Sequence, residues 1–379
     1  MHDPRLDKLA QVLVQYSTAV RPGDLVWLAG STITEPLIVA IYREVLRAGG
    51  HPHVELVPEA CSQWKLSEGT EEQLSFVDPI GQFAIEEIDV SISCWGSENT
   101  KALSRQEPAR QALVSQSRRQ YLAAFMKRFA AGQLRWVGTQ FPCQAAAQDA
   151  EMSLAEYERF VFAAGMLDRD DPAAAWREVS QRQQRLVDFL DDKREIRFVT
   201  PRGTDLRLGI EGRKWINCDG HENFPDGEVF TGPIEDATEG VVSYDFPAVH
   251  GGREVDQIRL VFRAGRVVEA TAEKGEAFLT AMLDQDAGAR VLGEVAIGTN
   301  YSINEYTKNT LFDEKIGGTF HAALGAAYPE SGGLNQSGLH WDMVSDLRRG
   351  GQVFVDGELI SDSGRFVNPQ WPQPAARSN

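Results

Sequence analysis

Features that define several large classes of protein are scarce in this chain of 379 residues. It has only four cysteines, and no two of them form a CxxC pair: Cys61, Cys94, Cys143 and Cys218. This wide spacing argues against a zinc knuckle and against a disulfide framework as the basis of the fold. A reducing compartment, the cytoplasm, is therefore the expected location.

Long apolar runs and surplus positive charge are missing as well. No stretch approaches the roughly 18 apolar residues of a membrane span, and no apolar segment follows a basic one at the N-terminus, so neither a span nor an export signal is expected. The formal net charge of −17 disfavours nucleic acid and anionic membranes as partners, whereas it permits attraction of cations. Neither GxGxxG nor GxxxxGK[ST] occurs, so the motifs do not point to nucleotide binding.

What the chain does contain is a normal globular composition, with 42% hydrophobic and 25% charged residues. Its length suggests two domains of ordinary size. The charged end of a predicted helix, residues 191–195, looks like a solvated helix terminus. We therefore predict a first domain over residues 1–193 and a second over residues 194–379.

The first half alternates short apolar strands with amphipathic helices. Residues 6–20 have a helical apolar face, residues 25–29 form an apolar run, and Thr34 can cap a helix over residues 35–48 before a strand at 51–57. Further strands are expected at 88–94 and 134–139, and Ser153 with Glu156 forms a capping-box pattern. This order predicts an α/β domain with an open, mainly parallel sheet.

The second half changes to a period of two, which is typical of antiparallel sheet. Alternating apolar residues predict strand pairs at 196–200 with 206–210, at 258–262 with 267–270, and at 353–355 with 359–360. Helical signal persists mainly at about 273–292, and the Pro-rich tail after Asn368 is expected to be loosely ordered or to run over the surface. The second domain is thus predicted to be largely antiparallel β, of the α+β class.

Polar residues in apolar or glycine-rich surroundings single out candidate functional positions in this half. Glu228 and Glu294 each stand in a Gly-Glu-Val sequence, and His321 has only small or apolar neighbours. His340 and Asp342 alternate on a predicted strand, so both leave the same face while Trp341 points away.

Each of these positions also has a purely structural explanation. A single buried Glu is often a hydrogen-bonded structural acid, and a single His in the core is usually satisfied there. The pair of His51 and His53 on the first-half strand has no third ligand and is better explained as polar strand residues.

The number of such residues in the second half favours function. Three carboxylates and two imidazoles can share an apolar region only if their charge is compensated, because unpaired buried carboxylates cost several kcal/mol each. Two divalent cations would provide that compensation, and this mixture of ligands suits zinc, cobalt or manganese better than calcium.

The motifs together resemble the M29 family of metallo-aminopeptidases over the whole chain. In the first half the resemblance rests on residues 21–24 and 47–50, and in the second, more specifically, on residues 223–233, 293–294, 309–315 and 340–342. The resemblance implies peptide substrates, a homodimer, and the metal ligands Glu228, Glu294, His321, His340 and Asp342, with Tyr328 lining or completing the site.

The expected chemistry is hydrolysis of the first peptide bond by water held between two metal ions. Glu294 or Glu228 would bridge the ions or carry the proton, and Tyr328, if not a ligand, would donate its hydroxyl to the oxyanion. One alternative is a ring-cleaving dioxygenase of the same fold, with one iron held by His321, His340 and Asp342. Another is a metal-binding protein without catalysis.

Overall fold

The computed structural model describes residues 3–374 and divides the chain into two compact units. Unit 1 comprises Met1–Ala173 with Gly220–Pro225, and unit 2 comprises Ala174–Asp219 with Asp226–Asn379. Each unit is described by itself below. The domain boundary near residue 193 stays a prediction.

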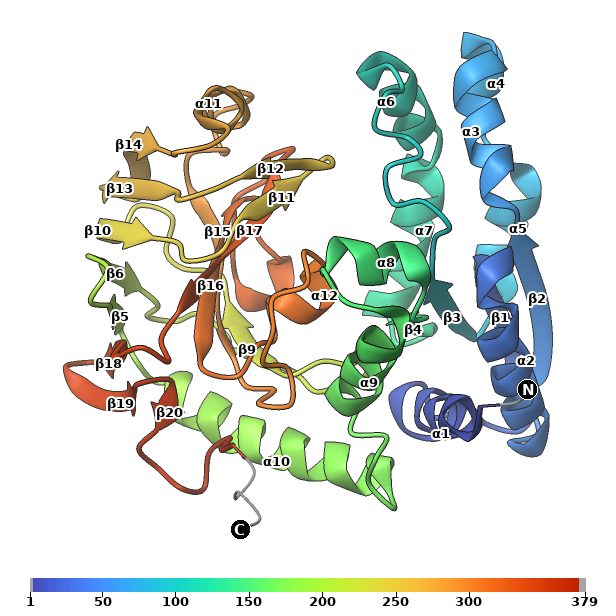
Figure 1. Ribbon diagram of the computed structural model, residues 1–379, viewed down its shortest axis with the longest axis horizontal. Helices are drawn as coiled ribbons and strands as arrows, with labels where there is room; N and C mark the ends of the chain where they lie inside the picture. The colour runs from blue at the N-terminus through green and yellow to red at the C-terminus, as the bar shows by residue number, and fades with distance from the viewer. Residues whose placement is uncertain (1–2, 375–379) are drawn as a thin grey trace. The chain divides into compact units, whose positions relative to one another are not determined.

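Unit 1 contains one parallel sheet (Figure 1). Its strands are β1 (Leu25–Ser31), β2 (His51–Val57), β3 (Val90–Trp95), β4 (Arg135–Gln140) and β8 (Asn223–Phe224). They lie in the order β2-β1-β3-β4-β8, and every neighbouring pair is parallel. The predicted α/β class is confirmed, because the short apolar runs form parallel strands and helices lie between them in the sequence.

The helices of unit 1 mostly begin where the sequence offers a cap or a proline. They are α1 (Pro4–Val12), α2 (Glu35–Arg47), α3 (Glu59–Glu68), α4 (Glu71–Leu74), α5 (Pro79–Glu87), α6 (Pro108–Ser117), α7 (Arg119–Ala130), α8 (Gln144–Asp149) and α9 (Leu154–Ala164). The predicted capping box before α9 is confirmed, since Ser153 and Glu156 bond each other's backbone N–H groups. The prediction for Thr34 was wrong: its hydroxyl donates to the carbonyl of Ser31, because a turn of 3-10 helix precedes α2.

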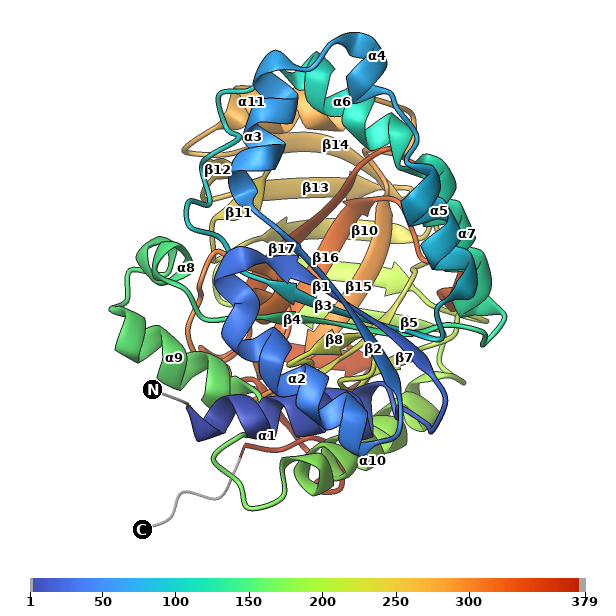
Figure 2. The ribbon, with the colours of Figure 1, turned by 90° about the vertical axis from the view of Figure 1, so that its right-hand side faces the viewer.

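Unit 1 leaves many large apolar side chains in contact with solvent. Helices α5 and α7 lie side by side (Figure 2), yet α7 has no buried residue and neither has α6. The most exposed apolar side chains of this region are Trp64, Phe76, Ile80, Phe83, Leu122 and Met126. An apolar surface of this kind commonly marks a place of protein contact.

Unit 2 is built mainly from antiparallel strands. They are β5 (Glu195–Val199), β6 (Asp205–Gly209), β7 (Ile216–Cys218), β9 (Glu228–Thr231), β10 (Thr238–Ser243), β11 (Ala248–His250), β12 (Arg253–Val255), β13 (Arg259–Arg263), β14 (Arg266–Thr271), β15 (Leu292–Gly298), β16 (Thr319–Gly325), β17 (His340–Asp346), β18 (Gln352–Val355), β19 (Glu358–Asp362) and β20 (Arg365–Phe366). An eight-stranded sheet has the order β14-β13-β10-β6-β5-β18-β19-β20, a five-stranded sheet has the order β17-β16-β15-β9-β7, and β11 pairs with β12. All three predicted strand pairs and the largely antiparallel class are confirmed.

Three helices accompany these strands: α10 (Pro172–Leu190), α11 (Glu276–Leu283) and α12 (Thr310–Asp313). The helix predicted over about 273–292 is much shorter. It ends at Leu283 because the following residues form turns in which Asp286 accepts backbone N–H groups of Gly288 and Ala289. No helix in the described part of the chain has the length and apolarity needed to cross a membrane.

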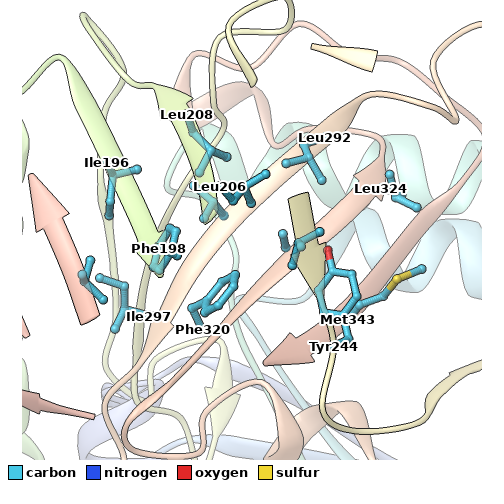
Figure 3. Packing of buried hydrophobic residues seen from close by; sticks show 14 of the residues in the cluster. Ile196, Phe198, Leu206, Leu208, Tyr244, Leu292, Ile297, Phe320, Leu324 and Met343 are labelled. Atoms are coloured by element: carbon cyan, nitrogen blue, oxygen red, sulfur yellow. The ribbon is translucent and has the colours of Figure 1, made fainter. Parts of the chain in front are cut away.

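The core of unit 2 lies between its two larger sheets. Phe198 of the eight-stranded sheet stacks on Phe320 of the five-stranded sheet, with ring centroids 4.1 Å apart (Figure 3). The C-terminal segment also joins this core, since Trp371 is buried and its ring lies 4.8 Å from that of Phe189. The tail after Asn368 was predicted to be loosely ordered or to run over the surface. Residues 369 and 370 are exposed, but the prediction is wrong at Trp371, and residues 375–379 lie outside the described part.

Candidate metal centre

In unit 2, one face of the five-stranded sheet β17-β16-β15-β9-β7 packs on the core, and the opposite face carries the candidate site. In β16, Phe320 and Ala322 belong to the core, so His321 between them points to the other face. In β17, Trp341 and Met343 belong to the core, which turns Asp342 the same way as His321. Alternation along neighbouring strands thus brings distant parts of the sequence together.

The predicted ligand residues form two overlapping groups that share Glu294. In the first group the Nε2 atom of His321 lies 3.2 Å from Oε1 of Glu294 and 3.5 Å from Oε2 of Glu228. In the second group the Nε2 atom of His340 lies 3.5 Å from Oε2 of Glu294 and 3.5 Å from Oδ1 of Asp342. Within each group the potential ligand atoms lie within 4.8 Å of one another. The two oxygens of Glu294 therefore face two different histidines.

The centre is enclosed, and two of its polar atoms lack protein partners. His321 is fully buried, and Glu228 and Glu294 are about as inaccessible, with relative exposures of 5% and 4%. Among the described residues, Nδ1 of His321 and Oε2 of Glu228 are buried without a hydrogen-bond partner. Buried polar atoms without partners are costly, and a bound cation would satisfy the carboxylate oxygen.

Burial and mutual repulsion shift the titration of these groups. Burial raises the pKa of Glu228, and burial followed by the charge of Glu314 raises that of Asp342. Burial by itself lowers the pKa of His321, but the neighbouring carboxylates Glu228 and Glu294 outweigh it and raise the pKa to about 10. The cluster therefore favours added positive charge, which divalent ions would supply.

His340 is oriented so that one ring nitrogen faces the cluster. Its Nδ1 lies 2.9 Å from the carbonyl oxygen of Ala326. Since a carbonyl only accepts, Nδ1 carries a proton, and in the neutral ring Nε2 would present its lone pair toward Glu294 and Asp342. Backbone orientation of a histidine in this way is common at metal sites.

Tyr328 lies at the edge of the cluster. Its ring centroid is 5.3 Å from that of His340 and 5.4 Å from that of Phe230. Burial, and then the charges of Glu294 and Asp342, raise the pKa of Tyr328, so its hydroxyl stays protonated and can act as a hydrogen-bond donor.

Two charged residues of the site were not predicted. Nζ of Lys315 lies 3.1 Å from Oε1 of Glu228 and 2.6 Å from Oε2 of Glu314, and Glu314 in turn hydrogen-bonds with Asp342. The signal available in the sequence was a run of charged residues, 313–315, between the apolar residues Phe312 and Ile316. Charged residues within an apolar run indicate a candidate functional position here, as they do at Glu228 and Glu294.

His51 and His53 do not belong to this cluster. Both lie on β2 of unit 1, where the ring of His53 packs on Trp27 with centroids 4.7 Å apart. No group of three potential metal ligands in the described part of the chain includes either residue. Their location on a strand was predicted, and their interpretation as polar strand residues stays a prediction.

The chain as a whole is similar to proteins of one known family. The model of the thermophilic metalloprotease family M29 matches residues 2–366. Aminopeptidase 2 of Geobacillus stearothermophilus is 30% identical over 408 aligned residues, which cover 96% of this chain and 98% of that protein. The structure of wild-type AmpT from Thermus thermophilus superposes with a TM-score of 0.85 at 26% identity, over 96% of this chain and 99% of that one.

A second solved structure is similar in fold alone. It is 2,5-dihydroxypyridine dioxygenase from Pseudomonas putida, with a TM-score of 0.63 and 14% identity over 96% of this chain and 97% of that one. The likeness is more distant in both measures than that to AmpT. It carries no argument about the reaction.

Proposed function

Because the chain belongs to the thermophilic metalloprotease family M29, as its motifs predicted, we propose that it is a metal-dependent aminopeptidase that removes N-terminal residues from peptides. The observation that carries this proposal is the position of Glu294 between two histidine-containing groups. A carboxylate whose two oxygens face two separate sets of ligands is suited to bridge a pair of ions.

We assign one ion to Glu228, Glu294 and His321, and the other to Glu294, His340 and Asp342. Nitrogen and carboxylate donors in these numbers fit zinc, cobalt or manganese. Each group supplies three protein ligands, which leaves positions for water and substrate as catalytic sites require.

The charge of the cluster supports two ions. The side chains of Asp226, Glu228, Glu294, Glu314 and Asp342 contribute five negative charges when ionised, and Lys315 contributes one positive charge. Four negative charges remain, which two divalent ions balance. Metal binding requires deprotonated carboxylates, so this count applies to the loaded protein.

The bound ions would lower the pKa of a shared water and polarise the scissile carbonyl. In this assignment Glu294 and Glu228 would both be held as metal ligands. Glu314 lies outside both groups but contacts Asp342, so we assign it the transfer of the proton from water to the leaving amine. We assign to the protonated hydroxyl of Tyr328, whose ring lies beside His340, a hydrogen bond to the oxyanion.

We further propose that the protein is a cytoplasmic homodimer. The exposed apolar side chains of α3, α5 and α7, among them Trp64, Ile80 and Phe83, support an interface on unit 1. The four cysteines are free, which fits a reducing compartment. Light scattering on the purified protein measures the oligomeric state, and a monomer at micromolar concentration would contradict this part of the proposal.

The test of the function combines elemental analysis with hydrolysis of amino-acid p-nitroanilides before and after chelation. We expect about two ions per chain, loss of activity on chelation, and recovery with Co²⁺, Zn²⁺ or Mn²⁺. Glu294→Gln should abolish activity and reduce metal content. The matched control is Glu44→Gln, because Glu44 is also buried but its carboxylate pairs with Gln15 and Arg47 in unit 1. A single iron per chain with no peptidase activity under any metal would overturn the proposal.

A further inference from the structure

A third group of potential metal ligands continues the row formed by the first two. Cys218, Asp226 and Glu228 place a sulfur and two carboxylates within 4.8 Å of one another. Cys218 lies directly opposite Glu228 in the pairing of β7 with β9. The third group shares Glu228 with the first, just as the first shares Glu294 with the second. By donor type alone, thiolate and carboxylate ligands would suit a soft to borderline cation such as cadmium or zinc.

A protein cation already lies at this end of the row. The ammonium of Lys315 is 3.1 Å from Oε1 of Glu228, and the charge of Asp226 also acts on it. Lys315 has a relative exposure of 2%, and a buried ammonium is retained only where acidic partners compensate it. Its position is fixed from a second side by Glu314, whose Oε2 lies 2.6 Å away.

The position of Lys315 also determines which oxygen of Glu228 is left for an ion. Lys315 contacts Oε1, whereas Oε2 faces His321 and has no hydrogen-bond partner among the described residues. Lys315 thus divides the two oxygens of Glu228 between the ammonium and the first metal group. Without Lys315, Oε1 would become available to the group that contains Cys218 and Asp226.

From these contacts we infer that Lys315 is a built-in cation that closes the group of Cys218, Asp226 and Glu228 to metal and so limits the centre to two ions. Lys315 is a positioning residue in this role, because it acts through Glu228. The inference rests on the proposed two-metal function. Loss of the ammonium leaves five carboxylates with two divalent ions and one uncompensated negative charge, so a third cation is then expected to bind.

Cadmium is the probe that tests the inference, because its bond to a thiolate produces an ultraviolet charge-transfer band. The reference protein and every variant in this test carry Cys61→Ser, because Cys61 is the exposed cysteine. Equilibrium dialysis of the otherwise unchanged protein should give two cadmium ions per chain without the thiolate band. Lys315→Met should bind three ions and show the band, and adding Cys218→Ser should remove both the band and the third ion.

Two further variants separate charge from structure. Lys315→Arg keeps the positive charge and should stay at two ions without the band, whereas Lys308→Met removes a partly exposed lysine paired with Glu254 and should also stay at two. A thiolate band in the protein that retains Lys315, or only two ions in folded Lys315→Met, would overturn the inference. The first of these outcomes needs no Lys315 variant to fold. Failure of the proposed function itself would be seen separately, as fewer than two ions in the protein that retains Lys315.

Discussion

The two units of this protein treat charge in opposite ways. Among the Asp, Glu, His, Lys and Arg residues described in unit 1, Glu44 alone is buried, and its carboxylate accepts hydrogen bonds from Gln15 and Arg47. Unit 2 instead buries a set of charged or titratable side chains that includes Asp226, Glu228, Glu294, Asp313, Lys315 and His321. Unit 1 exposes apolar side chains, and unit 2 encloses polar ones.

This difference identifies the part of the molecule in which stability and function compete. A buried carboxylate without a counter-charge destabilises the fold by several kcal/mol, and apolar replacements of similar size are often more stable. Strands β15 and β16 are buried along their whole length, so nothing in the sheet itself requires Glu294 or His321 there. The proposed metal ions would account for their presence.

The largest expected effect is the difference between two variants, each with one histidine replaced, one in each unit. His321→Ala removes the nitrogen that faces Glu228 and Glu294, so we expect a loss of bound metal and a fall in kcat/KM of at least about 100-fold. His53→Ala removes an exposed ring that packs on Trp27 and should leave both values unchanged. Elemental analysis and p-nitroanilide kinetics measure these outcomes. Equal losses in the two variants would mean that the chemistry is not confined to unit 2.

The second comparison exchanges a phenylalanine in each unit. Phe320 is fully buried and stacks on Phe198, so Phe320→Ala should destabilise the protein by about 3–5 kcal/mol. Phe83 is 66% exposed in the single chain, so the loss of its contacts within the chain should by itself change the free energy of unfolding by no more than about 0.5 kcal/mol. Urea unfolding reports both values. A large effect of Phe83→Ala would show that this face of unit 1 is covered in solution, which would support the proposed dimer interface.

The sequence predicted four of the five strands of the parallel sheet and six strands of the eight-stranded sheet, because their signals are local. Apolar runs flanked by Pro and Gly gave β1 to β4, and alternation gave the antiparallel pairs of unit 2. The helix predicted over about 273–292 was too long. The spacing of apolar residues gives no indication of the turn that Asp286 stabilises after Leu283. The cap at Thr34 failed because a hydroxyl can bond backward to a carbonyl as readily as forward to an N–H.

The site was only partly predictable for a similar reason. Alternation correctly placed His340 and Asp342 on one face, but simple alternation would put Glu294 on the same side as Leu292, which belongs to the core. A β-bulge between Leu292 and Glu294 reverses the parity and turns Glu294 to the site. Lys315 was missed because its contact with Glu228 depends on how the chain returns after α12, which no local pattern specifies.

A smaller effect is expected from the cap of α9 in unit 1. Ser153→Ala removes the hydroxyl that accepts the N–H of Glu156 and should cost about 1 kcal/mol of unfolding free energy. Metal content should not change, because Ser153 lies in unit 1 and the candidate metal ligands lie in unit 2. Glu156→Gln is the control, since the amide oxygen still accepts the N–H of Ser153. Equal destabilisation by the two variants would show that charge, rather than the hydroxyl, carries the cap.

The smallest expected effect concerns charges that unit 2 leaves in water. Asp205 contacts Nε of Arg197 at 2.6 Å, and the hydrogen bond from this guanidinium lowers the pKa of Asp205. A lowered folded-state pKa stabilises the protein above the ordinary carboxyl pKa of about 3.9, and the stabilisation is lost as the pH falls through the folded value. Because the pair is exposed, Asp205→Asn should cost only about 0.2–1 kcal/mol at pH 7, and this difference should shrink in acid and with added salt.

Urea unfolding at a series of pH values down to the lowest at which both proteins fold measures this difference. A gap that widens as the pH falls would contradict the assigned pairing. A small gap that closes in acid would show that exposed pairs such as Arg197 with Asp205 contribute little to stability. The buried contact of Lys315 with Glu228, in contrast, affects how many ions the centre holds. A pair of one positive and one negative side chain would thus have different consequences in the two places because of its burial alone.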